Sequence, residues 1–282
     1  MYNAAQTYHA TVTMLFPCRN WKPTPAIKLS ILVLAGCFTA TVFQTSLWPW
    51  TLGIVFVNHM ILTIAGLIPR STLLGQNITR LPPDAAQRGE VAITIDDGPH
   101  PEVTPQVLDI LDRYQAKATF FCIGNVAAQQ PELCREIVRR GHAIENHSLS
   151  HYWFFSLLDP WTIFHEVSEA QNVLGKVSGQ TPRFFRAIAG LRNPELEPVL
   201  AHCGLTLCTW SKRGFDTQVN DAEAVLHRLT RGLKGGDILL LHDGSAACTA
   251  EGKPVILDVL PRLLDNLAQA KLRSVTLRSA IP

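Results

Sequence analysis

The chain has 282 residues, enough for one large domain or two small ones, and its 47% hydrophobic against 17% charged residues is apolar for a soluble protein. The net charge of +2 and the lack of a Lys/Arg cluster with interleaved aromatic residues argue against a nucleic-acid partner. The seven cysteines form no CxxC pair, so we expect free thiols in a reducing compartment rather than a disulfide framework.

Residues 1–27 show no strong periodicity and are expected to form a polar N-terminal tail. The following stretch from Leu29 to Pro69 contains no Asp, Glu, Lys or Arg, which leaves room for about two membrane spans of roughly 20 residues each. A Trp-Pro-Trp sequence at 48–50 lies where a hairpin would turn and where interfacial aromatic side chains are found. We therefore predict a transmembrane hairpin over residues 28–70.

Basic residues flank this hairpin on both sides, which favours both of its ends in the cytoplasm of a cell with a bacterial-type inner membrane. They are Arg19, Lys22 and Lys28 before it and Arg70, Arg80 and Arg88 after it. The prediction is a multi-pass membrane protein in contact with lipid, with the catalytic part on the cytoplasmic face and the periplasmic face as the alternative. Two other interpretations are a lipoprotein-type signal ending at Cys37, whose apolar run is short, and one span followed by an interfacial or buried helix.

After a connector at 71–88, the part from 89 to 282 alternates between β-rich and helical patterns. Strands are expected at 91–97, 118–123, 143–147, 184–190, 205–211, 237–242 and 274–277, and helices at 105–114, 126–140, 162–177, 194–203, 222–232 and 255–270. Strict alternation implies parallel strands joined by helical crossovers. We therefore predict an α/β fold, a distorted (β/α)7 barrel preceded by two transmembrane helices.

Such barrels carry their chemistry at the C-terminal ends of the strands. Asp96 and Asp97 end the first strand, and His147 ends the third and is followed four residues later by His151. Asp97, His147 and His151 could hold a divalent metal with open positions for water and substrate. Asp96 would then remain as a general base towards water; the alternative is a structural carboxylate that caps the following turn.

Four further residues are expected near the same end of the barrel. His242 follows an apolar strand and could be a general acid or a hydrogen-bonded core histidine. Arg186 needs a carboxylate partner if it is buried, and Asp216 or Asp96 could provide one and so orient the base. Trp210 could be a core residue or a wall of a sugar subsite.

These residues stand in motifs that resemble the polysaccharide deacetylases, the NodB-like metal-dependent carbohydrate esterases. Thr94-Ile95-Asp96-Asp97-Gly98-Pro99 is similar to the first motif of that family, His147-Ser148-Leu149-Ser150-His151 to the second, and Leu241-His242 to the last. The resemblance covers about residues 89 to 280 and implies a seven-stranded barrel. It also implies Asp96 as base, Asp97, His147 and His151 as metal ligands, and His242 as acid.

Two motifs depart from the family pattern. In the third, Ile188 and Ala189 stand where a proline and an aromatic residue are usual, so that a backbone N–H at Ala189 could still serve an oxyanion while a side-chain wall is lost. The fourth motif is usually an Asp-rich segment ending in Trp. Here it corresponds to the segment 210–216, which does not align clearly with the family pattern. We expect Trp210 and Asp216 to contact the substrate.

The resemblance implies a hydrolase that removes an N-acyl group, acetyl in the first place, from an amino sugar of a polysaccharide or a lipid-linked glycan. Zinc is the expected metal and cobalt the alternative. Two rivals remain open: a glycan-binding module that has lost catalysis, motivated by Ile188 and Ala189, and an iron oxygenase with two histidines and one carboxylate. The sugar and the oligomeric state are not predicted.

Overall fold

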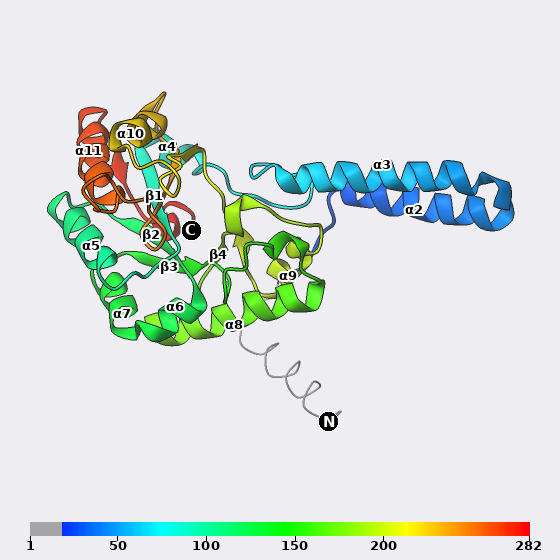
Figure 1. Cartoon of the computed structure of the whole chain (residues 1–282), viewed down its shortest axis with the longest axis horizontal. Helices are drawn as coiled ribbons and strands as arrows, with labels where there is room; N and C mark the ends of the chain where they lie inside the picture. The colour runs from blue at the N-terminus through cyan, green and yellow to red at the C-terminus, as the bar shows by residue number, and fades with distance from the viewer. Residues whose placement is uncertain (1–18) are drawn as a thin grey trace.

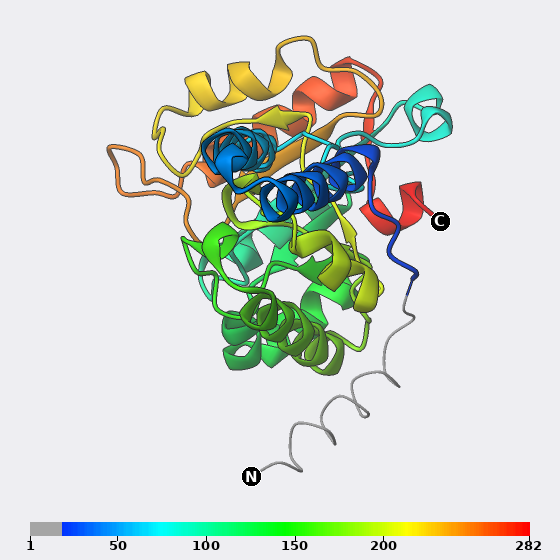
Figure 2. The same cartoon turned by 90° about the vertical axis from the view of Figure 1, so that its right-hand side faces the viewer.

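The computed structural model describes residues 19–282, so the first 18 residues of the predicted tail, Cys18 among them, lie outside the described part. Its most prominent feature is an antiparallel pair of helices, α2 (Pro25–Phe43) and α3 (Trp48–Leu67), joined through the short 3-10 turn η1 (Thr45–Leu47). The pair projects from one side of a globular α/β part (Figures 1 and 2). Helix α2 begins where the Thr24 side chain accepts a hydrogen bond from Ile27 N.

Both helical segments are long and apolar enough to cross a membrane, with mean hydropathies of 2.0 and 1.7 and few buried side chains. Two polar contacts join them: Asn58 donates to Ser30 at 2.8 Å, and the hydroxyls of Thr41 and Thr51 lie 2.8 Å apart. Apolar surfaces linked by a few polar contacts are typical of helices that pack in lipid, where no hydrophobic driving force brings them together.

The globular part is built on a curled sheet in which all the strand pairings are parallel, in the order β5-β4-β3-β2-β1-β7-β6, with β8 paired to β1. The strands are β1 (Glu90–Asp96), β2 (Ala118–Cys122), β3 (Ala143–Asn146), β4 (Phe184–Phe185), β5 (Thr206–Leu207), β6 (Lys212–Arg213), β7 (Ile238–His242) and β8 (Arg273–Ser274). The predicted fold class is confirmed in this parallel, incompletely closed barrel.

Most of the helices cover the outside of the sheet (Figure 1), while the two short helices before β1 and after β8 pack against residues inside the barrel. The helices are α4 (Pro83–Gln87), α5 (Val103–Arg113), α6 (Gly124–Gln129), α7 (Pro131–Arg139), α8 (Pro160–Ser178), α9 (Leu196–His202), α10 (Ala222–Thr230), α11 (Ile256–Gln269) and α12 (Leu277–Ala280), with the 3-10 turns η2 (Phe155–Leu157) and η3 (Ile188–Gly190). In β1 the outward residues Ile93 and Ile95 join the cluster formed with α5 and α11. Because side chains alternate along a strand, Thr94 and Asp96 point inward.

Several predicted elements have different bounds in the structure. The helix expected at 126–140 is two helices, because Pro131 cannot donate a backbone hydrogen bond and begins α7 instead of continuing α6. Strands β4 and β5 pair over two residues each, much shorter than the β-rich patterns at 184–190 and 205–211. Strand β6 and helix α4 were not predicted. No disulfide joins the cysteines of the described part.

The segment predicted as a connector at 71–88 packs into the barrel. Ile78 N donates to Leu207 O and Thr209 N donates to Ile78 O, which extends the β5 edge by a parallel bridge. On the other side Arg80 forms an antiparallel bridge with Asp237 and an ion pair of 2.7 Å with its carboxylate. Residues 78–80 therefore lie across the gap between the β5 edge and the start of β7.

The hairpin itself is fixed to the rim of the barrel. Arg192 N donates to Gly66 O at 3.1 Å, near the end of α3, and the Arg192 side chain donates to Ser71 O at 2.6 Å. Gly190 has a positive φ of 76°, and a Cβ there would overlap both Pro69 and the Trp210 ring. The end of the hairpin and the barrel therefore meet in a close backbone contact.

Substitution at Gly66 tests this contact. A Cβ at Gly66 would collide with the carbonyl oxygen of Arg192, whereas Gly53, in the same helix, has open space around it. We expect Gly66→Ala to lower the Tm of the detergent-solubilised chain and to expose the connector at 71–88 to limited proteolysis. Gly53→Ala should leave both unchanged or raise the Tm slightly, because alanine favours helix by about 1 kcal/mol. Equal behaviour of the two variants would contradict the close contact.

Candidate metal centre and active site

The polar residues at the strand ends surround one pocket. Asp96, the last residue of β1, stands in register with His242, the last residue of β7, so both enter the barrel mouth from neighbouring strands. A cavity of about 240 Å³ is lined by both residues together with Asp97, His147 and His151. Parallel strands thus deliver two carboxylates and three imidazoles to the same edge of the sheet.

Three of these residues form a group with the geometry of a metal site. The ligand atoms of Asp97, His147 and His151 all lie within 4.8 Å of one another. Asp97 Oδ1 is 3.2 Å from His147 Nε2 and 3.0 Å from His151 Nε2. His147 Nδ1 lies 2.8 Å from the carbonyl oxygen of Arg186, and a carbonyl can only accept, so Nδ1 carries the proton. The lone pair of His147 Nε2 is therefore left to face Asp97.

The donor set fits a divalent cation. Asp97 Oδ1 is buried and has no donor in hydrogen-bond geometry, although an unsatisfied buried carboxylate oxygen is costly. Burial favours the neutral acid, yet the two nearby imidazoles hold the pKa of the Asp97 carboxyl well below its usual range. One carboxylate and two imidazoles with room for further ligands is a common set for catalytic zinc and related ions.

The backbone around this group is held in an uncommon conformation. Asp97, Ser148 and His151 have positive φ angles of 74°, 65° and 53°, in the left-handed region that costs energy for residues other than glycine. Side-chain contacts maintain the loop: Asn146 Oδ1 accepts from Ser148 N at 2.9 Å, and Ser148 Oγ accepts from His151 N at 3.0 Å. Both imidazoles are thereby turned towards Asp97.

The other carboxylate of the pair, Asp96, is held separately from Asp97. Arg186 Nη1 donates to Asp96 Oδ1 at 2.7 Å, which is the second of the two pairings considered from sequence. Arg186 is fully buried, stacks 4.0 Å above the Phe121 ring, and also donates to the carbonyl oxygens of Cys208 and Thr209. Arg186 is therefore a positioning residue, which fixes the orientation of the Asp96 carboxylate. Asp96 Oδ2 lies 3.9 Å from His147 Nε2.

His242 has a carboxylate partner of its own, and this corrects the prediction that Asp216 contacts substrate. Asp216 is fully buried; its Oδ1 lies 2.9 Å from His242 Nδ1 and its Oδ2 accepts from His242 N at 2.7 Å. Both oxygens are taken up by His242, so none faces the pocket. Although burial disfavours the imidazolium, the bond to Asp216 raises the pKa of His242 above its usual value.

The altered third motif lies on the pocket wall. Ile188 and Ala189 line the cavity within the 3-10 turn η3, and Ala189 is exposed with a φ of 55°. Trp210 also lines the cavity, with 6% of its surface exposed, while most of the ring packs with Leu81, Leu240 and other core residues. Trp210 is therefore both a core residue and a wall of the site.

Sequence reasoning missed three residues that belong to this site. Ser245 donates to Asp97 Oδ2, so that it holds the carboxylate oxygen that faces away from the histidines. Asp243 is buried, accepts from Thr104, and has a pKa raised by burial to about 7. Arg213 lines the pocket from β6. The polar run after His242 was a signal for the first two; nothing in the sequence pattern set Arg213 apart from surface arginines.

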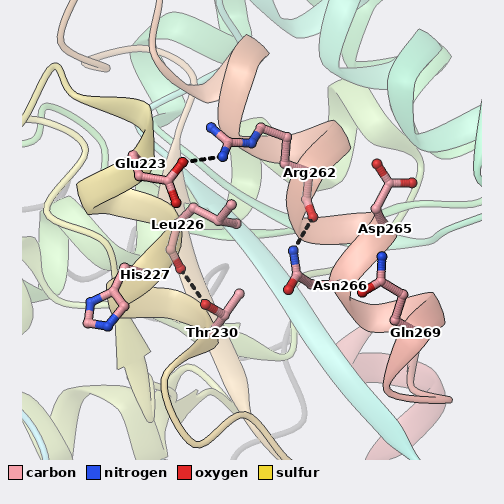
Figure 3. Close-up of a pocket in the computed structure, with 8 residues that line it drawn as sticks. All are labelled: Glu223, Leu226, His227, Thr230, Arg262, Asp265, Asn266 and Gln269. Atoms are coloured by element: carbon pink, nitrogen blue, oxygen red, sulfur yellow. Dashed lines mark hydrogen bonds and ion pairs between the residues drawn. The ribbon is translucent and has the colours of Figure 1, made fainter.

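A second pocket, of about 380 Å³, lies between α10 and α11 and away from the strand ends (Figure 3). Two of its charged side chains pair with each other, since Arg262 forms an ion pair with Glu223, and Asn266 donates to the carbonyl oxygen of Arg262. The pocket contains none of the candidate metal ligands, so it does not compete with the strand-end site.

Comparisons with known proteins agree with the motifs. The polysaccharide deacetylase family matches residues 84–208. A chitooligosaccharide deacetylase of Bradyrhizobium sp. strain ANU 289 is 35% identical over 162 residues, which cover 57% of this chain and 74% of the relative. A peptidoglycan-N-acetylglucosamine deacetylase of Bacillus cereus is 31% identical over 188 residues, covering 66% and 85%. The chain belongs to the polysaccharide deacetylase family.

The structure of this family member is also similar to solved relatives. The family 4 carbohydrate esterase from Streptomyces lividans, in complex with acetate, is 32% identical and superposes with a TM-score of 0.60 over 66% of this chain and 91% of that one. The family predicted from the motifs is confirmed, and the curated relatives are N-deacetylases, hydrolases that act on carbon–nitrogen bonds. Enzymes of this family use a divalent metal, as the triad of Asp97, His147 and His151 leads one to expect.

Removal of one ligand tests the metal centre. We expect Asp97→Ala to weaken zinc affinity by more than about a hundredfold, because the variant loses the only anionic ligand of the triad. Ser245→Ala removes a hydrogen bond to the same carboxylate and should cost only about tenfold. Isothermal titration calorimetry of zinc into the detergent-solubilised, metal-stripped chain measures both. Unchanged affinity in Asp97→Ala would show that zinc binds elsewhere.

Proposed function

We propose that this chain is a metal-dependent N-deacetylase that removes an N-acyl group, acetyl in the first place, from an amino sugar of a polysaccharide or a lipid-linked glycan. The observation that carries the proposal is the convergence of Asp96, His242 and the triad of Asp97, His147 and His151 on one pocket. The names of the relatives, deacetylases of chitooligosaccharide and of peptidoglycan N-acetylglucosamine, support the same reaction and substrate class.

The metal would be held by Asp97, His147 and His151, with zinc as the proposed ion and cobalt as the alternative. A bound divalent cation supplies a Lewis acid and lowers the pKa of water that binds it. The chain contributes the supporting shell: Arg186 O holds His147 in the required tautomer, and Ser245 holds the second oxygen of Asp97.

Proton transfer is assigned to the two remaining groups. Asp96, fixed by Arg186, takes a proton from the attacking water. The backbone N–H of Ala189, on the pocket wall, donates to the oxyanion that develops on the acyl oxygen. His242, kept protonated by Asp216, gives a proton to the departing amine as the carbon–nitrogen bond breaks. The products are the free amino sugar and a carboxylate.

The two rival functions have weaker support. A glycan-binding module without catalysis would not need an acid and a base with separate buried partners, as Asp96 has in Arg186 and His242 has in Asp216. An iron oxygenase with the same ligands is disfavoured by the parallel barrel and by relatives that are hydrolases. Release of free amine without oxygen uptake would distinguish a hydrolase from both the glycan-binding module and the iron oxygenase.

The N-terminal helices suggest where the enzyme works. We propose a domain organisation with a tail at 1–27, a transmembrane hairpin at 28–70, a connector at 71–88 and a catalytic domain at 89–282. The protein would be a multi-pass protein of a bacterial-type inner membrane, with its catalytic domain on the cytoplasmic face because basic residues flank both ends of the hairpin. A cytoplasmic site would favour a lipid-linked precursor as substrate, and the periplasmic face is the alternative.

Asp96→Asn tests the base. We expect turnover of N-acetylated chitotetraose to fall by about 100-fold to 10,000-fold, because the amide cannot accept the proton from water. Zinc affinity should remain close to that of the wild type, since the ligands are unchanged. Amine release measured with a fluorogenic amine reagent, together with titration calorimetry, separates the two effects. Retained turnover would assign the base to another group.

Asp216→Asn tests the acid through its pH dependence. His242 must be protonated to act, and Asp216 raises its pKa, so the active form persists to higher pH in the wild type. Loss of the charge at residue 216 lowers that pKa, and the alkaline limb of the pH profile of kcat/KM should move to lower pH. The exposed Glu132→Gln on α7 serves as the control and should leave the profile in place. An unmoved alkaline limb in Asp216→Asn would exclude His242 as the titrating acid.

A further inference from the structure

One charged side chain on the wall of the pocket has no part in the proposed reaction. Arg213 lies in β6 opposite Leu240 of β7, and both residues line the cavity that holds Asp96 and His242. The interpretation of Arg213 that follows rests on the proposed function, because it concerns the substrate that this pocket receives.

The guanidinium of Arg213 is held in place without an anionic partner. It lies 5.2 Å from the centre of the Trp210 ring and 4.8 Å from that of Phe215. Within residues 19–282 it forms no ion pair and its side chain donates no hydrogen bond; its Nε is buried without an acceptor. A buried donor that is left unsatisfied costs about 1–3 kcal/mol, so an acceptor brought by a ligand would be favoured.

The surroundings of Arg213 maintain this position. Phe215 has a φ of 61°, in the left-handed region, and its ring lies between Arg213 and Arg228, whose guanidinium is 5.9 Å from the ring centre. The carboxylates that follow Arg213 in sequence are already engaged: Asp216 bonds to His242, Asp221 accepts from Glu223 N, Glu223 pairs with Arg262, and Asp237 bonds to Arg80 and Ser211. The charge of Arg213 is therefore not neutralised within the described part of the chain.

A second unpaired arginine lies outside the pocket, beside Ser211, where the hairpin reaches the barrel. Arg70 lies shortly after the end of α3 at Leu67 and donates to Ser211 O at 3.4 Å, and it forms no ion pair with any residue in the range that the structure covers. Trp210 and Ser211 thus lie between two arginines, one on the pocket wall and one at the end of the proposed membrane anchor. Two positive charges without an ion-pair partner in the described range therefore flank Trp210 and Ser211, near the point where the hairpin reaches the barrel.

We propose that Arg213 binds a phosphate group attached to the amino sugar that the enzyme deacylates, with Arg70 adding to the attraction at the entrance. The planar fork of an arginine matches phosphate oxygens, and stacking on Trp210 and Phe215 fixes its orientation. Sugars carried by membrane lipids are joined to them through phosphate, and the end of the hairpin lies at this wall. A soluble sugar phosphate carries the same kind of phosphate group and is the other source of the phosphate that Arg213 would bind.

Three substrates test the inference with the full chain in detergent micelles: neutral N-acetylated chitotetraose, N-acetylglucosamine 1-phosphate, and N-acetylglucosaminyl phosphate on a polyprenyl chain. We expect Arg213→Gln to lower kcat/KM for the two phosphate-bearing substrates by roughly tenfold to a hundredfold, the effect of losing a charged hydrogen bond. Turnover of the neutral tetramer should stay within about twofold, because that substrate carries no phosphate for Arg213 to bind and so loses no interaction with it in the transition state. Arg213→Lys should recover part of the loss, and Arg139→Gln on the exposed face of α7 should change none of the three.

Equal losses on all three substrates, or no loss on any, would overturn the assignment of Arg213. A preference of the wild type for the polyprenyl substrate over the soluble one would assign the phosphate to a membrane lipid, and the reverse preference to a soluble sugar phosphate. If the wild type releases no amine from any substrate, the proposed function fails. In that case the affinity for N-acetylglucosamine 1-phosphate is compared between the Asp96→Asn variant and the variant that carries both Asp96→Asn and Arg213→Gln. This comparison still decides whether Arg213 binds the phosphate.

Discussion

The whole site depends on one buried cation, Arg186. Its guanidinium reaches Asp96 and Thr94 on β1 and the carbonyl oxygens of Cys208 and Thr209 beyond β5, while its own carbonyl oxygen accepts from His147. A single residue thus links the base, a metal ligand and the strand edge across the barrel interior. A guanidinium with no exposed surface is stable only when its donors are satisfied, so these contacts form together or not at all.

This constraint separates two carboxylates that are adjacent in sequence. The side chain of Asp96 is in phase with the inward face of β1 and so meets Arg186, whereas Asp97 comes after the strand and turns, with a positive φ, towards the histidines. The two carboxylates therefore have different partners: a fixed guanidinium for Asp96 and the pair of imidazoles for Asp97. Asp96 and Asp97 are the same residue type, and their chemical roles differ because their side chains point in different directions.

The sequence was sufficient for the fold class, for seven of the eight strands and for the residues at the strand ends, because each of these follows from alternation and from the polar residues that terminate apolar runs. Contacts between distant segments could not be derived in the same way. Asp216 looked like a substrate contact until His242 was found to use both of its oxygens. The polar run after His242 could place Ser245 near the site, but it could not identify Asp97 as its partner, since that contact is made by a loop over long sequence separation.

The pairing of residues 78–80 with the β5 edge and with Asp237, at the start of β7, has a consequence for how this enzyme can be divided. A truncation that begins at 89, where the composition changes, would remove the parallel bridge to Cys208 and the ion pair between Arg80 and Asp237. It would also expose the apolar residues that Leu81 and Ala85 cover. The two N-terminal helices and the enzyme are thus not interchangeable modules: recombination of the barrel with another N-terminal segment would have to preserve the chain from the end of α3 onward, or the barrel would open at its unpaired edge.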